Sequence, residues 1–255
     1  MIGATGRLCN YVAGRAERGR TMVGPPDMDQ LDSIPLLADI PGDALQAISR
    51  QCSWVSYDDH ELVVDYADTT TDVRFILSGG VRVIFRAPSG KEMILGEIGD
   101  GMFFGELAAI DGDIRSANVT TTAKSRICAM PASVFCKLLA DYPDVAMTVM
   151  RVLTQRIRQL NRRVAEHSFL DAKFRLYNEL IRLSRPRSGK PDQRIISPPP
   201  NQSELAERIG CRREVVSREI ARLKNDGIVE ASRGGLVLLS PETLSRLLTN
   251  AWTGE

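Results

Sequence analysis

The chain contains the stretch Phe103-Phe104-Gly105-Glu106-Leu107-Ala108-Ala109-Ile110, and Arg115-Ser116-Ala117 follows a few residues later. This pattern indicates the end of a strand, a glycine-led turn of helix, a short polar loop and a second strand. The first amides of such a turn have no partner inside the helix, so they can donate hydrogen bonds to a phosphate. Arg115 can add a charged, two-pronged contact to the same anion, and Ser116 offers one more donor.

Glu106 does not fit a simple anion site. A carboxylate beside an anion is favourable only if it accepts a hydrogen bond from something else, such as a sugar hydroxyl. An anion next to a hydroxyl-bearing sugar suggests a nucleotide. A capped turn with a surface arginine explains the same spacing equally well, and the residues alone leave both interpretations open.

A second motif lies near the C-terminus. Asn201 followed by Glu204 resembles a capping box, Gly210 supplies a turn, and a second helix begins at about Arg213. This order predicts a helix-turn-helix, and Asp226-Gly227 leads into a predicted β-wing. The residues expected in its core are Leu205, Ala206, Ile209, Val216, Ile220 and Leu223.

Polar side chains occupy the outer face of the second helix of this motif. In the first turns of a helix bound in the major groove, arginine can bridge guanine and glutamate can accept from cytosine. A solvated charged helix in a three-helix bundle is the alternative interpretation. The residues expected to face DNA bases are Arg213, Glu214, Ser217 and Arg218, and those expected near the DNA backbone are Arg208, Arg222, Lys224 and Arg233.

Together the two motifs resemble the CRP/FNR family of bacterial transcription regulators, in particular its cAMP-receptor type. Residues 104–117 resemble the family's phosphate-binding cassette, residues 90–95 resemble the segment upstream of it, and residues 213–218 resemble its recognition helix. The resemblance runs from about Ile34 to Leu239. It implies an α+β fold with an N-terminal cyclic-nucleotide-binding β-roll (a double-stranded β-helix), a long dimerisation helix and a C-terminal winged helix-turn-helix.

The resemblance also implies roles for individual residues. Glu106 would bind the ribose hydroxyl, and Arg115, Ser116 and the amides of Gly105–Leu107 would hold the cyclic phosphate. Arg156 would pair with Glu106. The other pocket residues implied in this way are Val83, Leu95, Phe104, Leu107, Leu160 and Asn161, and base reading carries over to Arg213, Glu214 and Arg218.

Three positions depart from the family pattern. Leu160 and Asn161 replace the threonine and serine that contact adenine in the family, and Arg212 replaces a serine helix cap. Leucine cannot bond to a base amino group, whereas the asparagine amide offers both a donor and an acceptor. We therefore predict that the protein discriminates weakly between cAMP and cGMP.

The remaining sequence predicts the domain organisation. We expect a disordered tail at 1–27, a nucleotide-binding domain at 28–142, a dimerisation helix at 143–167 and a DNA-binding domain at 168–255. Short strands with turns about every ten residues, such as those at 73–77 and 81–86, favour a sandwich or barrel in the nucleotide-binding domain. A break at 166–171 predicts a hinge, and the Pro- and Gly-rich segment 184–200 predicts an irregular connection.

The predicted dimerisation helix carries a narrow apolar seam with arginines on its other faces. Such a seam is typical of a two-stranded coiled coil and predicts a homodimer, although a helix lying on its own β-domain would show the same pattern. The seam residues are Ala146, Val149, Leu153, Ile157, Leu160 and Val164. A homodimer implies a near-palindromic double-stranded DNA site, and the family resemblance implies RNA polymerase as a further partner.

Composition limits the other function classes. The 255 residues are 43% hydrophobic and 25% charged with a net charge of +1, so any DNA contact must come from a local patch. Five scattered cysteines without a CxxC pair predict reduced thiols in the cytoplasm and no iron–sulfur cluster or other metal. No apolar run is long enough to cross a membrane. An enzyme is disfavoured, while a β-roll that senses another ligand, or none, stays an alternative.

Overall fold

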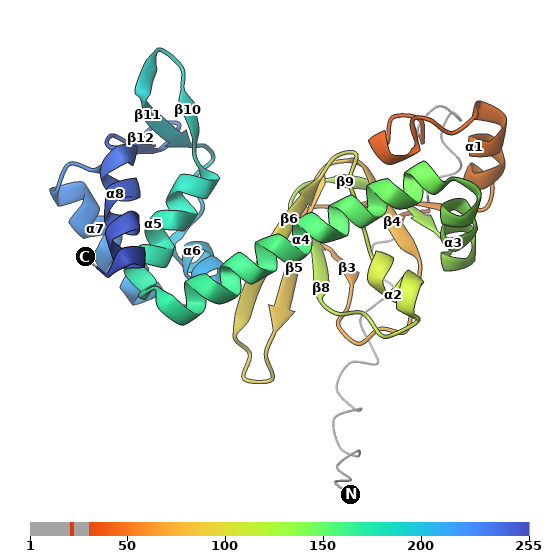
Figure 1. Cartoon of the computed structure of the whole chain (residues 1–255), viewed down its shortest axis with the longest axis horizontal. Coiled ribbons are helices and arrows are strands. Elements are labelled where there is room, and N and C mark those ends of the chain that lie inside the picture. The colour runs from red at the N-terminus through yellow and green to blue at the C-terminus, as the bar shows by residue number, and fades with distance from the viewer. Residues whose placement is uncertain (1–20, 23–30, 255) are drawn as a thin grey trace, which may run out of the picture. The chain divides into compact units, whose positions relative to one another are not determined.

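The computed structural model describes residues 21–22 and 31–254 of the chain. Most of the predicted tail at 1–27 therefore lies outside the described residues. The chain forms two compact units: residues up to 83 together with 97–146, and residues 84–96 together with 147–255. The elements carry the labels of Figure 1.

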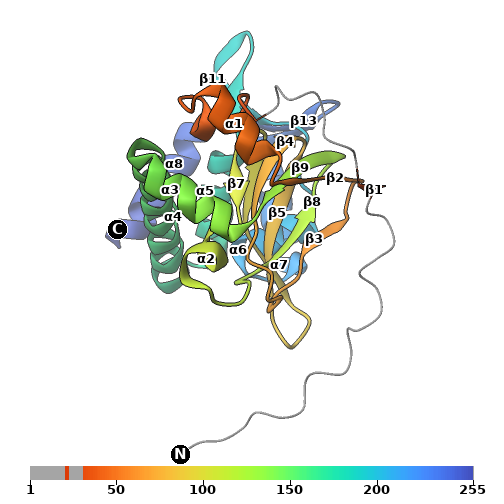
Figure 2. The same ribbon diagram turned by 90° about the vertical axis from the view of Figure 1, so that its right-hand side faces the viewer.

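The first unit is built on antiparallel strands, as expected for a β-roll. One sheet has the order β1-β2-β9-β4-β7, and a second has the order β3-β8-β5-β6 (Figure 2). The central strand of the first of these sheets, β9, pairs antiparallel with both β2 and β4. The strands are β1 (Thr21–Met22), β2 (Ser53–Tyr57), β3 (Leu62–Val64), β4 (Val73–Ser78), β5 (Gly80–Arg86), β6 (Glu92–Gly99), β7 (Phe103–Phe104), β8 (Asn118–Thr121) and β9 (Ser125–Met130). The end of β5 and the start of β6 lie within residues 84–96 and are counted with the second unit.

The core of this unit takes side chains from several strands. Its buried members are Tyr57, Val63, Val64, Ile76, Val81, Phe104, Val119 and Ile127. In β4 Val73 and Phe75 alternate with Arg74 and Ile76 along the strand, yet all four side chains are buried. The alternation therefore does not separate a buried from an exposed face, because β4 lies between β9 and β7 and its arginine has partners inside the unit.

Short helices cover the ends of the first unit. They are η1 (Pro35–Leu37), α1 (Gly42–Ser49), α2 (Glu106–Asp111) and α3 (Ala132–Asp141). Helix η1 begins at Pro35, α1 follows Pro41, and α2 is the predicted helical turn after β7. Helices α2 and α3 lie next to each other in the first unit (Figure 2).

The long helix α4 (Pro143–Phe169) begins at a proline, whose missing N–H costs nothing at the first position of a helix. Its helical conformation continues to Phe169, two residues beyond the predicted end at 167. The hinge predicted at 166–171 is therefore shorter than expected: only Leu170 and Asp171 separate α4 from α5 (Ala172–Leu183). Leu170 is buried in the core of the second unit, which fixes one side of this break.

The second unit contains the predicted helix-turn-helix and wing, namely α6 (Gln202–Ile209), α7 (Arg213–Asn225), β12 (Val229–Ser232) and β13 (Gly235–Leu238). All six side chains that the sequence places in the core of the motif are buried in one cluster with α5. A terminal helix, α8 (Pro241–Thr253), was not predicted, and it adds Leu244 and Leu248 to the same cluster.

The expectation of an irregular connection at 184–200 was wrong. This segment forms the antiparallel strands β10 (Arg185–Arg187) and β11 (Lys190–Ile196) (Figure 1). Strand β11 continues the sheet by pairing with β13. The register places Ile196 opposite Leu236. Proline and glycine weaken a strand locally, and the pairing of β11 with β13 supplies the backbone hydrogen bonds that stabilise it.

Candidate nucleotide site and DNA interface

Helix α2 is held between two glycines with left-handed backbones, Gly105 at φ 84° and Gly112 at φ 74°. A Cβ atom on Gly105 would lie 2.6 Å from Nη1 of Arg115 and 2.9 Å from the carbonyl oxygen of Asp72. Both the backbone angle and the close approach of these groups therefore require glycine at position 105.

Arg115 is buried beside this glycine, with 3% of its surface exposed. Its Nη1 donates to the carbonyl of Gly105 (2.9 Å), and its Nε donates to Oγ1 of Thr70 (3.2 Å). Its Nη2 donates to both the carbonyl oxygen (2.8 Å) and the carboxylate Oδ1 (3.1 Å) of Asp72. The two-pronged anion contact expected from the sequence stays a prediction. To make it, the guanidinium of Arg115 must give up some of these hydrogen bonds.

Asp72 bridges two arginines. Its Oδ2 accepts from Nε of Arg74 at 2.6 Å, while Oδ1 faces Arg115. Arg74 is itself buried and also donates to the carbonyl of Val63. Burial lowers the pKa of Arg115 from its ordinary value; Asp72 acts in the opposite direction, and Arg74 adds to the lowering. An arginine remains protonated under these conditions, so the cluster carries more positive than negative charge.

The other predicted nucleotide residues of the first unit differ in exposure. Glu106 is buried with 3% exposed, and Phe104 belongs to the core. Ser116 is exposed, as is Leu107 at 47%. Val83 is half-buried against the core. Glu106 and Ser116 thus lie at the two ends of the segment that contains α2, as the sequence predicted.

The remaining predicted nucleotide residues belong to the second unit. Leu95 on β6 and Arg156 on α4 are half-buried. Leu160 is 49% exposed, and Asn161 beside it is also exposed. The contribution of these four residues to a nucleotide pocket stays a prediction.

The DNA-binding motif begins at a capped helix. The side chain of Asn201 accepts from the backbone amide of Glu204 at 2.9 Å, which confirms the predicted cap of α6. Gly210 takes the left-handed conformation at φ 64° and turns the chain toward α7. Arg212 precedes α7, and its side chain makes no capping hydrogen bond with any described residue. The serine cap of the family is thus not replaced by another capping side chain.

Helix α7 presents the predicted base-reading residues to the solvent. Arg213, Glu214 and Arg218 are exposed, and Ser217 is half-buried. Val216, Ile220 and Leu223 on the opposite face are buried. The polar and charged side chains thus lie on the exposed side of α7, and the buried apolar side chains on its other side hold the helix in the unit.

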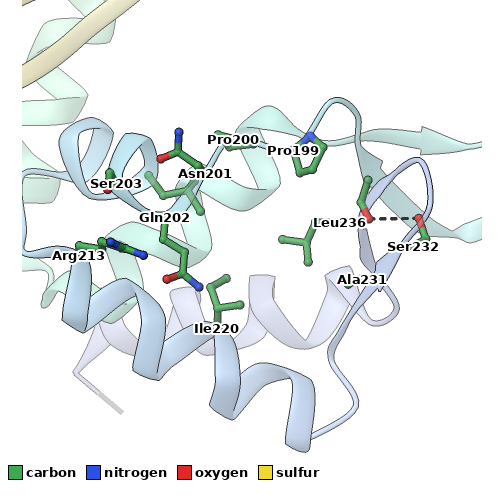
Figure 3. A pocket seen from close by; sticks show the side chains of 12 residues that line it. Pro199, Pro200, Asn201, Gln202, Ser203, Arg213, Ile220, Ala231, Ser232 and Leu236 are labelled. Carbon is green, nitrogen blue, oxygen red and sulfur yellow. Dashed lines mark hydrogen bonds between the residues drawn. The ribbon is translucent and has the colours of Figure 1, made fainter.

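An open groove of about 700 Å³ lies between the start of α6, the first half of α7 and the wing (Figure 3). Gln202 and Arg213 line one part of it, and Ser232 and Leu236 line the wing side. Ser203 also lines this groove, and the capping box places both Gln202 and Ser203 in the first turn of α6.

Two arginines expected near the DNA backbone have partners inside the unit instead. Arg208 is buried and lies 2.9 Å from Glu204 and 3.7 Å from Glu179. Arg222 pairs with Glu219 at 2.8 Å and also donates to the hydroxyl of Tyr177. The spacing of charges along the helices is compatible with the pairs to Glu204 and Glu219 but does not reveal the contact of Arg208 with Glu179 on another helix. The side chain of Arg222 is 51% exposed, so its contact with the DNA backbone stays a prediction.

Two family models match this chain. The model described as "Cyclic nucleotide-binding domain" matches residues 54–142, which include α2 and Arg115. The model described as "Crp-like helix-turn-helix domain" matches residues 174–247, which include α6, α7 and the wing. Together the two matches cover more than half of the chain. The chain belongs to the CRP/FNR family of transcription regulators.

Curated relatives of this CRP/FNR-family protein are themselves transcription regulators, not enzymes. It is 27% identical over 205 residues to the CRP-like cAMP-activated global transcriptional regulator of Mycobacterium tuberculosis, covering 80% of this chain and 91% of that protein. It is also 27% identical to the cAMP-activated global transcriptional regulator CRP of Haemophilus influenzae, covering 71% and 81%.

Solved structures show the same fold. The c-di-GMP-responsive global regulator CLP of Xanthomonas campestris matches with a TM-score of 0.66 and 25% identity, covering 75% of this chain and 95% of that chain. CooA from Carboxydothermus hydrogenoformans also matches with a TM-score of 0.66, at 19% identity, covering 78% and 88%. These matches confirm the predicted order of β-rich domain, long helix and helix-turn-helix.

The long helix of this CRP/FNR-family chain leaves three of its six predicted seam residues exposed to solvent. Ile157 is 57% exposed, Leu160 49% and Val164 65%, whereas Val149 near the start of the helix is buried.

Among the described residues, no helix is long and apolar enough to span a membrane. Within the same residues, no group of His, Cys, Asp and Glu side chains is arranged to hold a metal ion.

Proposed function

We propose that this regulator binds a cyclic nucleotide at Gly105–Leu107 and Arg115, and that binding raises the affinity of a homodimer for DNA. The observation that carries the proposal is the buried guanidinium of Arg115 held against a glycine-led turn, inside the segment matched by the cyclic-nucleotide-binding model. Its positive charge and the donors beside it suit a cyclic phosphodiester. Glu106 would accept from the ribose hydroxyl.

The proposed ligand is cAMP, cGMP or both. The relatives in Mycobacterium and Haemophilus are named as cAMP-activated, which favours cAMP. Leu160 and Asn161 favour weak discrimination, because neither repeats the threonine and serine of the family at the base. The similar regulator from Xanthomonas is named as c-di-GMP-responsive, so a cyclic dinucleotide is the second candidate ligand.

The proposed homodimer forms through the seam of α4. Ile157, Leu160 and Val164 recur at spacings of three and four and are exposed in the single chain. Pairing two such helices would bury these side chains against each other. A two-fold dimer carries two copies of α7, which favours a near-palindromic site with half-site centres about one helical turn of DNA apart. Arg213, Glu214, Ser217 and Arg218 would read the bases. RNA polymerase is the further partner implied by the family.

Regulation then requires the nucleotide to bind the DNA-competent dimer more tightly than the idle dimer. A coupling free energy of about 1–3 kcal/mol is typical of such systems. Helix α4 connects the matched nucleotide-binding segment with the DNA-binding unit in sequence, so a change in its pairing would reach α7.

The test is selection of a DNA site from a random duplex library by the full chain. Parallel arms contain no ligand, cAMP, cGMP or c-di-GMP. We expect an enriched two-fold-symmetric site and at least a fivefold gain in affinity with cAMP or cGMP. An Arg115→Gln variant should remain folded and dimeric by sedimentation and thermal unfolding but lose this gain. A gain that survives in this variant, or an affinity indifferent to all three nucleotides, would contradict the proposal.

A further inference from the structure

We propose that Asp72 limits the affinity of the nucleotide site by competing with the ligand's phosphate for Arg115. The inference rests on the proposed function, since it concerns the same site. It assigns to Asp72 the role of an internal counter-ion that sets how much nucleotide is needed to occupy the site.

The competition follows from the hydrogen bonds of the guanidinium. Nη2 of Arg115 donates to both the carbonyl oxygen and the carboxylate of Asp72, and Nη1 donates to Gly105. Among the described residues, no buried side-chain nitrogen or oxygen lacks a hydrogen-bond partner. A phosphate that takes two prongs from Arg115 must therefore replace a bond that the protein already makes.

Of the two acceptors on Nη2 of Arg115, the carboxylate of Asp72 is the one that a phosphate can replace more easily, because it lies at 3.1 Å and the carbonyl oxygen of Asp72 at 2.8 Å. The same carboxylate is held more closely by Arg74, at 2.6 Å. Asp72 is also the more exposed partner, with 23% of its side chain accessible against 3% for Arg115. If the phosphate takes its place, Asp72 keeps its ion pair with Arg74 and is not left as an unpaired buried charge.

The charge balance has the same consequence. Arg74, Asp72 and Arg115 together carry one net positive charge, and Asp68 adds a further negative charge that acts on Arg115. The carboxylate of Asp72 stays nearby and repels the ligand's phosphate. An Asp72→Asn substitution removes the repulsion but retains an oxygen that can accept from Arg115, so the guanidinium keeps its orientation.

The experiment is calorimetric titration of the full chain and its variants with cAMP, cGMP and c-di-GMP. We expect Asp72→Asn to bind its nucleotide about tenfold more tightly than the wild type, as expected when a like charge is removed close to an anion. The matched control is Asp113→Asn, which removes an exposed charge from the loop between α2 and β8 that also carries Arg115; among the described residues, Asp113 accepts only from the amide of Ile114. It should change affinity less than twofold.

The outcomes separate the two proposals. If the wild type binds nucleotide and Asp72→Asn binds equally or more weakly, the role of Asp72 is refuted while the proposed function stands. If neither protein binds any of the three nucleotides, the proposed function fails and the inference fails with it. Should Asp72→Asn not fold, a crystal structure of the wild type with cAMP decides: competition requires the bond between Arg115 and the Asp72 carboxylate to be broken and that between Arg74 and Asp72 to remain. Retention of both refutes the inference.

Discussion

At the scale of single residues, Gly105 and Gly112 provide a matched pair at the two ends of α2. Both have left-handed backbones, but a Cβ on Gly112 would meet no described atom within 4 Å, whereas one on Gly105 would clash with Arg115 and Asp72. We expect Gly112→Ala to lower the free energy of unfolding by about 1 kcal/mol and Gly105→Ala by about 3 kcal/mol. Urea unfolding measures both values.

The same pair tests the nucleotide site. Gly105→Ala should abolish binding of cAMP in calorimetry, because the new methyl group displaces the guanidinium that we propose holds the phosphate, whereas Gly112→Ala should leave binding intact. Equal affinities for the two variants would show that the position of Arg115 against Gly105 does not matter for the ligand.

Sequence reasoning could find Gly105 and Arg115 but not their neighbours. The need for glycine and the charge of arginine are local properties, visible in a short stretch. Asp72, however, is 43 residues away from Arg115 along the chain. The pairing of β4 with β7, with Arg74 opposite Phe104, brings Asp72 and Arg74 to the turn. A contact created by strand register leaves no signal in the spacing of the residues involved.

At the scale of elements, Tyr177 connects α5 with α7. It is fully buried, and its hydroxyl bonds to Glu219 and Arg222 on α7. Burial, followed by the bond to Glu219, raises the pKa of Tyr177 to about 12 from its ordinary value of 10.0. The folded protein thus favours the neutral phenol, and this contribution to stability is complete below about pH 10 and is lost as the pH rises toward 12.

Tyr177→Phe should therefore remove one pH-dependent contribution. We expect the variant to be less stable by about 1–3 kcal/mol at pH 8, because Glu219 loses a hydrogen-bond partner. The difference between the two proteins should shrink between pH 10 and 12. Chemical unfolding of both at several pH values measures this, and a difference that stays constant across that interval would argue against the raised pKa.

The elements themselves were predictable where their stability is local. The apolar stripe of α7 identified Val216, Ile220 and Leu223 correctly, because a helix repeats every 3.6 residues whatever surrounds it. The β10–β11 hairpin was missed, because its prolines and glycine weaken the local signal and its stability comes from pairing with β13. The buried ion pairs of Arg208 were missed for the same reason, since Glu179 lies on another helix.

At the scale of the whole molecule, the exposed seam of α4 predicts how two chains associate. Val164 is 65% exposed in the single chain, so a charge there should change the stability of the monomer by less than about 0.5 kcal/mol. In a dimer the same position is buried, and two copies of a new carboxylate would face each other. We expect Val164→Glu to weaken the dimer about hundredfold, which is about 2.7 kcal/mol. Analytical ultracentrifugation measures the dissociation constant.

The matched control is Gln155→Glu, which adds the same charge to an exposed position of α4 about half a turn away from the seam. It should leave the dimer intact. We propose that two copies of α7 read a palindrome only when they are joined in a dimer. The affinity of Val164→Glu for a full site should then fall to its affinity for a half-site, while Gln155→Glu should still bind the full site more tightly than the half-site.

If both variants dimerise alike and show the same preference for the full site over the half-site, α4 is not the dimer interface. The symmetry of the DNA site must then come from contacts elsewhere.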